Sequence, residues 1–279
     1  VDNGSRDGTA ELVRKRFPFV QVLALPENRG FAGGNNVGLK QMKGRHAVLL
    51  NDDTLVRRDA FEACVRFLDA NPDVGVAGPQ LENPDGSRQN CIHNYPSLVT
   101  ELLPKGAMEL LFPRRFPSKR FVHAGPIDVE AVLGACLFVR REVFENVGVM
   151  PEDYFFFLEE TEWCYRIRQA GWRIMHVPEA RIVHLLGAST KLRFPAETRI
   201  EYHRSLYHFF RKNRGLVSAS LVVVMRSLKS LLYVVLGLPR VFTRRGRESW
   251  RVRRKVAASH LRGCPKGWGL AASRLSERS

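Results

Sequence analysis

Short apolar runs alternate with segments of helical periodicity along the first two thirds of the chain. The apolar runs predict strands at residues 21–25, 46–50, 74–78, 129–139 and 173–183. The periodic segments predict helices at residues 9–16, 35–42, 58–70, 141–147 and about 159–171. Strands that alternate with helices over short links are typical of a parallel sheet covered by helices, so we expect an α/β fold. We expect residues 80–127, rich in Pro, Arg and Phe, to form an irregular region over the ligand crevice.

Composition indicates a globular protein from a reducing compartment. Of the 279 residues, 44% are hydrophobic and 26% are charged. The five cysteines form no Cys-x-x-Cys pair, which argues against a disulfide framework and against a zinc–cysteine cluster. The chain starts without a Met, and Val1-Asp2-Asn3-Gly4-Ser5 has the pattern of a strand end, so we expect an N-terminal truncation.

Charge divides the chain into two regions. Residues 1–190 hold 23 Lys and Arg against 24 Asp and Glu, a net charge of −1, whereas residues 191–279 hold 21 against 4, a net charge of +17. We therefore expect a near-neutral domain over 1–190 and a basic, helical tail over 191–279. A tail of this charge is suited to anionic phosphate, on lipid or on nucleic acid.

An apolar stretch within the tail favours the membrane. Residues 216–238 are mostly apolar, but Arg226 and Lys229 interrupt them, so no uncharged run reaches the ~18 residues expected of a spanning helix. On a helix these cations share one sector with Ser218 and Ser230. We expect a helix lying in the interface of an anionic membrane, with an ordinary helix packed on the first domain as the alternative. No nucleic acid partner is expected, because the tail has no helix-turn-helix, zinc or aromatic-interleaved pattern.

Asn51-Asp52-Asp53 directly follows the strand predicted at 46–50. Side chains at the carboxyl ends of parallel strands face the ligand crevice of an α/β sheet. Paired carboxylates there suit Mg²⁺ or Mn²⁺ bridging a diphosphate, because both ions prefer oxygen ligands. Alternatively, Asp52 or Asp53 caps the next predicted helix.

The segment from Gly30 to Gly38 is dense in glycine and leads into a predicted helix. Its backbone amides can approach a phosphate closely. The segment matches neither the Gly-x-Gly-x-x-Gly nor the Walker pattern, which argues against a Rossmann dehydrogenase and a P-loop NTPase. A tight loop that needs positive φ angles explains the glycines equally well.

Residues 155–164, Phe-Phe-Phe-Leu-Glu-Glu-Thr-Glu-Trp-Cys, combine aromatic rings with carboxylates. On the predicted helix, Glu160 shares a face with Cys164, whereas Glu162 can pair with Arg166 four residues on. An inward carboxylate beside phenylalanines is expected to have a raised pKa, as a general base requires. The alternative, that acidic residues simply favour a helix N-terminus, explains Glu160 less well than its neighbours.

His184 ends the strand predicted at 173–183. A lone histidine at a strand end is more often structural than a metal ligand, so this residue alone predicts no site.

Six segments, taken in order, resemble the family 2 glycosyltransferases of the GT-A fold. They are Val-Asp-Asn-Gly-Ser-x-Asp-Gly-Thr (1–9), Asn-x-Gly-Phe-Ala-Gly-Gly-Asn-Asn-x-Gly (28–38), Leu-Leu-Asn-Asp-Asp-Thr (49–54), Gly-Ala-Cys-Leu-Phe-Val-Arg-Arg (134–141), Phe-Leu-Glu-Glu-Thr-Glu-Trp-Cys-Tyr-Arg (157–166) and His-x-x-Gly-x-Ser (184–189). Bacterial rhamnosyltransferase-like members are the most similar. The family's first strand is absent here, and its usual Glu-Asp pair stands as Glu159-Glu160.

The resemblance implies a GT-A type, mostly parallel sheet flanked by helices. It also implies an inverting transfer of a sugar from a nucleotide-diphosphate donor to an acceptor hydroxyl. In that reaction Glu160 is the expected catalytic base. Asp53 and His184 are the expected ligands of Mg²⁺ or Mn²⁺, which neutralises the departing diphosphate. The residues expected to support the base are Glu159, Glu162 and Trp163.

The same resemblance implies the donor contacts. Asp2 is expected to contact the nucleobase, and Asp52 is expected to lie near the ribose. The residues expected to bind the nucleotide sugar are Asp2, Asn3, Ser5, Asn28, Gly30, Gly33, Asn35, Asn51, Asp52, Gly134 and Ala135.

A glycan or polyprenyl-linked acceptor suits a tail that binds an anionic membrane surface. We therefore expect a peripheral enzyme of bacterial cell-surface polysaccharide synthesis, on the cytoplasmic face of the inner membrane. Rhamnose from a thymidine or uridine donor is the first expectation, with galactofuranose, glucose and mannose as alternatives. The competing hypothesis is an inactive, truncated fragment that acts as a basic membrane- or nucleic-acid-binding protein.

Overall fold

The computed structural model describes residues 1–118, 121–185 and 194–271, which divide into two compact units. The sheet unit comprises Val1–Tyr95, Leu103–Tyr154 and Glu159–Gly187. The helical unit comprises Pro96–Leu102, Phe155–Leu158 and Ala188–Ser279. The domain boundary expected at residue 190 lies outside the described residues.

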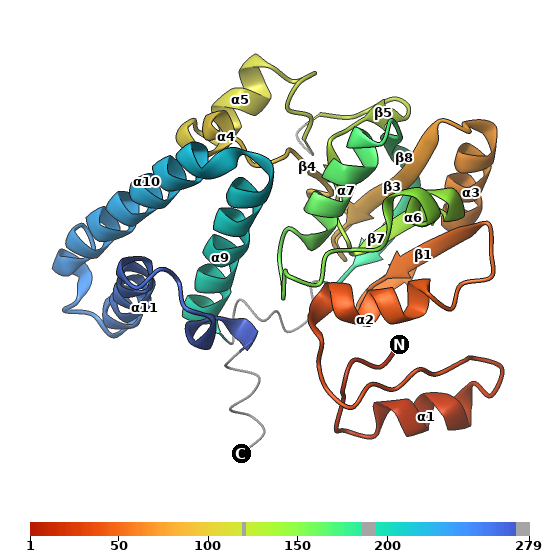
Figure 1. Ribbon diagram of the computed structural model, residues 1–279, viewed down its shortest axis with the longest axis horizontal. Helices are drawn as coiled ribbons and strands as arrows, with labels where there is room; N and C mark the ends of the chain where they lie inside the picture. Colours follow the sequence, from red (N-terminus) through yellow and green to blue (C-terminus); the bar gives the residue numbers. More distant parts are fainter. Residues whose placement is uncertain (119–120, 186–193, 272–279) are drawn as a thin grey trace. The chain divides into compact units, whose positions relative to one another are not determined.

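The sheet unit is built on a six-stranded sheet in the order β1-β7-β3-β8-β2, with β5 also paired to β8 (Figure 1). Its strands are β1 (His46–Leu50), β2 (Thr54–Val56), β3 (Val74–Glu82), β5 (Ile127–Asp128), β7 (Cys136–Arg140) and β8 (Arg173–His184). A second, two-stranded sheet pairs β4 (Ile92–His93) with β6 (Ala131–Val132).

The α/β class, with helices flanking a central sheet, is confirmed, but the expected mostly parallel pairing is wrong. Only β3 and β8 pair in parallel within the described six-stranded sheet. β7 lies antiparallel between β1 and β3, and both β2 and β5 are antiparallel to β8. The long connection from β3 to β7 reverses the chain, so β7 enters between two strands that share no hydrogen bonds with each other.

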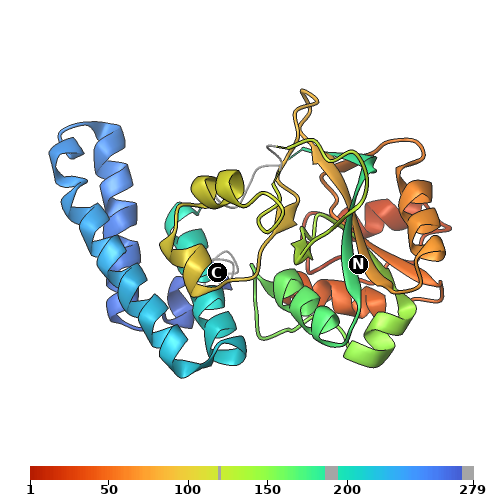
Figure 2. The same ribbon diagram turned by 90° about the horizontal axis from the view of Figure 1, so that it is seen from above.

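The helices of the sheet unit are α1 (Thr9–Arg16), α2 (Gly30–Leu39), α3 (Ala60–Ala70), α5 (Lys105–Leu111), α6 (Arg141–Val147) and α7 (Glu159–Gln169). Figures 1 and 2 show α2, α6 and α7 in front of the sheet in the first view. α3 packs on β3, β7 and β8 with Ala60, Cys64 and Leu68, which share one face at four-residue spacing. β4, α4 (Leu98–Leu102) and α5 form within residues 80–127, so the expectation of an irregular region there is wrong in part.

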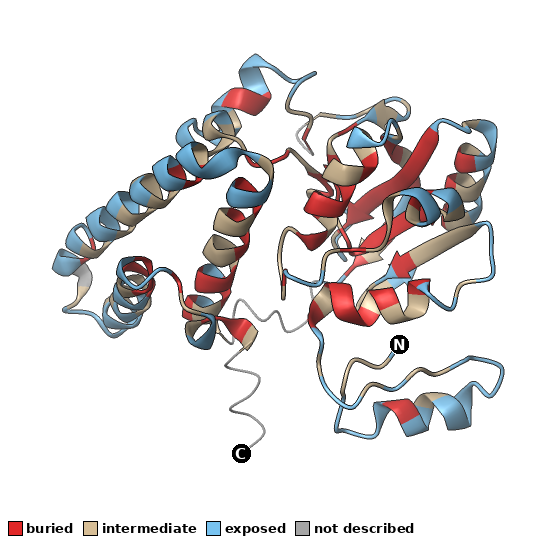
Figure 3. Ribbon diagram, viewed as in Figure 1, coloured by how far each residue is buried: buried red, intermediate tan, exposed pale blue. Residues whose placement is uncertain are grey.

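The buried centre of the sheet unit follows β3, which is buried at every position from Val74 to Glu82 (Figure 3). A continuously buried strand is covered on both faces. The strand predicted at 21–25 is reduced to a parallel bridge between Asp2 and Ala24. The strand predicted at 129–139 is split into β6 and β7.

The helical unit confirms the helical nature of the C-terminal region. Its helices are α4 (Leu98–Leu102), α9 (Pro195–Asn213), α10 (Gly215–Val235) and α11 (Arg244–Leu261), with short 3₁₀ turns η1 (Leu238–Arg240) and η2 (Lys266–Trp268). The core between α9 and α10 consists of the apolar side chains Leu206, Phe210, Ala219 and Val222. α11 packs against both helices.

Arg226 on α10 faces the interior of the helical unit. Arg226 pairs with the buried carboxylate of Glu101 on α4, and Val222, one turn earlier, is fully buried. By length and composition alone, α10 is long and apolar enough to cross a membrane, and few of its side chains are buried. The interruption by Arg226 is thus compensated inside the unit, and the apolar side of α10 is left exposed.

Two largely buried histidines lie in contact within the helical unit. The ring centroids of His203 and His260 are 4.6 Å apart, and the Tyr207 hydroxyl lies 2.9 Å from His260 Nδ1. Burial, reinforced by the neighbouring histidine and by Arg226, lowers the pKa of His203 to about 3. Burial and Arg226 lower the pKa of His260 to about 4.

We expect acid to destabilise the helical unit. Because both pKa values are lowered by folding, the unfolded chain, with histidine pKa values near ~6.5, binds these protons more tightly. The stabilisation is complete above pH ~6.5 and is lost as the pH falls toward about 4. His203→Phe should keep the packing and reduce this pH dependence. Urea unfolding midpoints of both proteins across this pH range test the prediction, and an identical loss in the variant would contradict it.

Candidate functional site

Asp53 and His184 face each other where β2 meets β8. Thr54 stands opposite His184 in the antiparallel register, and the backbone N–H of Leu185 donates to the Asp53 carbonyl at 2.8 Å. These backbone contacts bring the two side chains together, with 3.2 Å between Asp53 Oδ1 and His184 Nε2. The two expected metal ligands, far apart in the sequence, are therefore neighbours.

The turn that carries Asp53 is fixed to the β6–β7 link. The backbone N–H of Asn51 donates to the carbonyl of Ala135 at 2.9 Å, and the Asp52 side chain is exposed beside it. Neither aspartate caps α3, because β2 intervenes and the helix begins only at Ala60. The capping alternative for these residues is wrong.

The Asp53–His184 pair has the donor chemistry of a partial metal site. One carboxylate and one imidazole suit Mn²⁺ or Mg²⁺ when phosphate oxygens and water fill the other positions. Among the residues that the structure describes, no group of three or more His, Cys, Asp or Glu side chains is arranged to hold a metal ion. The residues present thus fit an ion that is shared with a phosphate-bearing ligand.

Glu160 lies in the first turn of α7, beside the β6–β7 link. A Cβ atom at Gly134 would lie 3.7 Å from Glu160 Cγ and 2.9 Å from the ring of Phe31, so this position has room only for glycine. Glu160 Oε2 is buried without a hydrogen-bond partner in the described part of the chain. Burial raises the pKa of Glu160, and backbone amides, including that of Gly134, offset part of the rise. The geometry matches a base that is desolvated but held in place.

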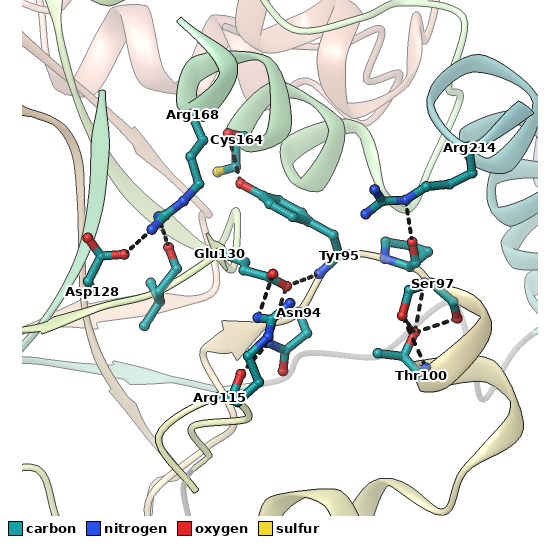
Figure 4. A network of polar contacts seen from close by, with 12 residues as sticks. Asn94, Tyr95, Ser97, Thr100, Arg115, Asp128, Glu130, Cys164, Arg168 and Arg214 are labelled. Carbon is teal, nitrogen blue, oxygen red and sulfur yellow. Dashed lines mark hydrogen bonds and ion pairs between the residues drawn. The ribbon is translucent and has the colours of Figure 1, made fainter. Parts of the chain in front are cut away.

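Polar contacts in the middle and last turn of α7 fix the position of this helix (Figure 4). The Tyr95 hydroxyl donates to the carbonyl of Cys164 at 3.0 Å, while the Tyr95 backbone N–H donates to Glu130 at 2.6 Å. Arg168 pairs with Asp128. The helix that carries Glu160 is thereby tied to β5 and to the segment that precedes α4.

Glu162 and Trp163 take part in contacts that join α7 to the loop after α6. Glu162 is buried and pairs with Arg166 at 2.9 Å, as its spacing predicted. The Arg166 guanidinium also donates to the carbonyls of Val147 and Val149, and the indole N–H of Trp163 donates to the carbonyl of Gly148. These contacts hold the loop after α6 against α7. Glu159 is buried next to Glu160.

The first expected donor-binding residues form a second cluster at the start of α2. Asn3 donates to Asn28 Oδ1 at 3.2 Å and to the Gly30 carbonyl at 2.8 Å. Asp2 Oδ1 accepts the backbone N–H of Ser5 at 2.9 Å. Phe31 on α2 links this cluster to Gly134, so segments from three regions of the sequence meet around the N-terminus of α2.

The glycine-dense segment is helical, which corrects its expected role as a loop before a helix at 35–42. Asn28 Oδ1 accepts the Gly30 N–H at 2.9 Å, and α2 begins there with Gly30 at a φ of 77°. Gly33 lies inside α2, where a Cβ atom would lie 2.6 Å from Arg29 Cβ. Asn35 donates to the Phe31 carbonyl within the helix. Gly33 and Asn35 thus take part in the packing of α2, and their contact with the donor stays a prediction.

Two residues that sequence reasoning missed, Asn36 and Gln89, hold the site together. Asn36 exchanges hydrogen bonds with the backbone of Met150 and donates to Glu152 at 3.0 Å. Gln89 contacts His184 with both ends of its side-chain amide. The adjacent Asn35-Asn36 pair inside a helix was the only sequence signal for Asn36, and Gln89 had none. Gly187 and Ser189 of the final segment lie outside the described residues.

Comparison with known proteins identifies the family. The family model described as "Glycosyl transferase family 2" matches residues 1–148. The N-acetylglucosaminyl-diphospho-decaprenol L-rhamnosyltransferase of Mycobacterium tuberculosis is 29% identical over 229 residues, which cover 75% of this chain and 72% of that protein. The dTDP-rhamnosyl transferase RfbF of Shigella flexneri is 26% identical over 171 residues, covering 60% and 53% of the two chains.

A solved structure shares the fold. A mannosyltransferase from Pyrobaculum calidifontis superimposes with a TM-score of 0.52 at 18% sequence identity, covering 93% of this chain and 76% of the other. The family match includes the cluster at the start of α2, the turn that carries Asp53 and the β6–β7 link, and it ends before Glu160 and His184. The chain belongs to glycosyl transferase family 2.

Proposed function

We propose that the protein transfers a sugar from a nucleoside-diphosphate donor to a glycan or lipid-linked acceptor, with inversion at the anomeric carbon. The observation that carries the proposal is the 3.2 Å contact between Asp53 and His184, together with a buried carboxylate oxygen on Glu160 that has no hydrogen-bond partner in the described part of the chain. Residues 134 and 135 connect the two groups, because Gly134 contacts Glu160 and Ala135 accepts from Asn51.

Each group of site residues has a separate role in this proposed reaction. Asp53 and His184 would hold a divalent cation, which would stabilise the negative charge of the leaving diphosphate. Glu160 accepts the proton of the acceptor hydroxyl as that oxygen attacks the anomeric carbon. Asp2 and Asp52 contact the base and the ribose of the donor.

Rhamnose is the first sugar to test. The names of the curated relatives from Mycobacterium tuberculosis and Shigella flexneri both specify rhamnosyl transfer, and the first names a polyprenyl-diphosphate acceptor. The test incubates the full chain with thymidine- and uridine-diphosphate sugars and a polyprenyl-diphosphate N-acetylglucosamine acceptor. Transfer that requires Mn²⁺ or Mg²⁺ and stops with a chelator is expected. Failure of every donor with either ion would favour an inactive fragment, which the homology to active glycosyltransferases disfavours.

We further propose that the helical unit holds the enzyme on an anionic membrane surface at the cytoplasmic face. Seven apolar side chains on α10 fall within about 100° at 100° per residue, opposite Arg226. They are Val217, Leu221, Val224, Leu228, Leu231, Leu232 and Val235, each 41–77% exposed. On α11, exposed Arg244, Arg247, Arg251 and Arg254 form a basic row at three- and four-residue spacing. An exposed apolar stripe beside exposed arginines is typical of an interfacial helix pair.

Vesicle binding should depend on both the apolar stripe of α10 and the basic row of α11. Wild type is expected to sediment with anionic vesicles at low salt and weakly with neutral ones, and high salt should release part of it. Arg247→Ala with Arg251→Ala should weaken anionic binding about 30-fold, because each basic residue contributes ~1 kcal/mol. Leu221→Ser with Leu228→Ser should weaken binding to both kinds of vesicle.

Leu12→Ser, at an exposed leucine of the sheet unit, is the matched control and should bind as wild type does. Equal, salt-independent binding to both vesicle types would instead indicate a spanning helix. No binding to either would remove the membrane proposal.

A further inference from the structure

Gln89 is buried in the turn between β3 and β4, directly behind His184. Its backbone N–H donates to the Leu81 carbonyl at 2.7 Å, and its carbonyl accepts from Gln80 at 3.1 Å. Its side-chain amide nitrogen donates to the His184 carbonyl at 2.6 Å and to Asn83 Oδ1 at 2.8 Å. Its Oε1 lies 3.0 Å from His184 Nδ1. Backbone and side chain of Gln89 are therefore both fixed.

These contacts determine the orientation of the Gln89 amide. A backbone carbonyl only accepts hydrogen bonds, so the NH₂ group must face the His184 carbonyl. The opposite orientation would place Gln89 Oε1 against that carbonyl and against Asn83 Oδ1. Asn83 is itself oriented, because its Nδ2 donates to Ser87 Oγ at 2.8 Å. The Gln89 oxygen consequently points at His184 Nδ1.

An acceptor at Nδ1 determines the tautomer of His184. The Nδ1 atom must carry the hydrogen, so the neutral ring presents an unprotonated Nε2. That Nε2 lies 3.2 Å from the Asp53 carboxylate. The carboxylate is itself an acceptor, so this contact needs a cation at Nε2, either a proton or a metal ion. The Gln89 contact thus prepares a pair of ligand atoms for a cation.

We propose that Gln89 is a positioning residue that sets the Nδ1–H tautomer of His184 and so makes Nε2 a metal ligand. The inference rests on the metal site proposed above for the transfer reaction. Gln89 acts only through His184 and is placed to contact neither the donor nor the acceptor. Residues that orient a ligating histidine typically change metal affinity by 10–100-fold when they are lost.

Three variants separate the tautomer from general packing. Gln89→Met keeps the length of the side chain and removes its hydrogen bonds. Asn83→Ala removes one partner of the Gln89 amide but leaves both of its contacts with His184. Gln41→Met repeats the first substitution at an exposed position of the sheet unit. Urea unfolding midpoints show that each variant is folded.

The first readout is nitrogen-15 NMR of the histidine rings in the metal-free full chain, at a pH well above the ordinary histidine pKa. We expect the Nδ1–H tautomer at His184 in wild type, in Asn83→Ala and in Gln41→Met. Gln89→Met should give the Nε2–H form or a mixture. An Nε2–H ring in wild type, or an unchanged tautomer in Gln89→Met, would overturn the proposal.

The second readout is Mn²⁺ binding in the presence of uridine diphosphate, measured by calorimetry. Gln89→Met should weaken it 10–100-fold, while the two control variants stay within about threefold of wild type. Equal affinity in Gln89→Met and wild type would overturn the inference. Absence of Mn²⁺ binding in wild type would instead overturn the metal site itself, whereas the NMR result would still decide whether Gln89 sets the tautomer.

Discussion

Glu160→Gln should abolish sugar transfer while leaving donor binding nearly unchanged. The substitution keeps the shape of the side chain and its place beside Gly134, but an amide cannot accept the proton of the acceptor hydroxyl. Loss of a general base typically lowers the rate by ~10²–10⁴-fold. Single-turnover transfer, measured beside calorimetry with the nucleoside diphosphate, separates the chemical step from binding.

Two comparisons make this experiment specific. Glu145→Gln, at an exposed position on α6, is the matched control and should retain full activity. Glu162→Gln should lower the unfolding midpoint through its lost pairing with Arg166, with a smaller effect on the rate. If Glu160→Gln retained more than about a third of the wild-type turnover while Glu159→Gln was inactive, the base would be the neighbouring carboxylate.

The rate should also depend on pH through Glu160. Only the ionised carboxylate accepts a proton, so the transfer rate must rise with pH through the pKa of this group. Because burial raises that pKa, the rise should be centred above the ordinary glutamate value of ~4.3. A pH–rate profile of wild type in single turnover measures it, and an acid limb at the ordinary value would contradict a desolvated base.

Asp53→Ala should remove most of the metal binding and, with it, most of the affinity for the donor diphosphate. The substitution deletes a carboxylate in contact with His184, and a bound cation would link the protein to the phosphates. His184→Ala should have a smaller effect, because Asp53 and the diphosphate still hold the ion. Calorimetry with uridine diphosphate, with and without Mn²⁺, measures both variants.

Glu62→Ala, an exposed acidic residue on α3, controls for the loss of one negative charge and should bind as wild type does. The decisive comparison is the dependence on Mn²⁺. Equal donor binding by wild type and Asp53→Ala, with no gain from Mn²⁺ in either, would mean that these residues hold no metal.

Local patterns located most elements that bear the candidate site. The apolar run 46–50 and the polar turn after it gave β1 and the Asp52-Asp53 position. The carboxylate-rich start of α7 and the alignment of Glu160 with Cys164 followed from helical spacing. These features depend on side chains only a few residues apart, so the local sequence pattern is enough to predict them.

The glycine-dense segment shows where local reasoning failed. Glycine disfavours helix, so the segment was expected to be a loop. Three features overcome that preference: the hydrogen bond from the Gly30 N–H to Asn28, the close approach of Asn3 to Gly34, and the hydrogen bond from Asn36 to the Met150 carbonyl. Contacts across the fold compensate for the weak intrinsic propensity, and the glycines allow the close approach.

The sequence by itself determined the α/β class, the family, the helical tail and the residue types of the site. Only the tertiary structure decided that β7 runs antiparallel between β1 and β3, that Asp53 meets His184, that Gln89 orients His184, and that Arg226 turns inward to Glu101. Periodicity within a segment shows which side of that segment is apolar, but not which distant segment it will face. Strand order and long-range polar pairs depend on how the whole core packs, so they are decided only when the chain folds.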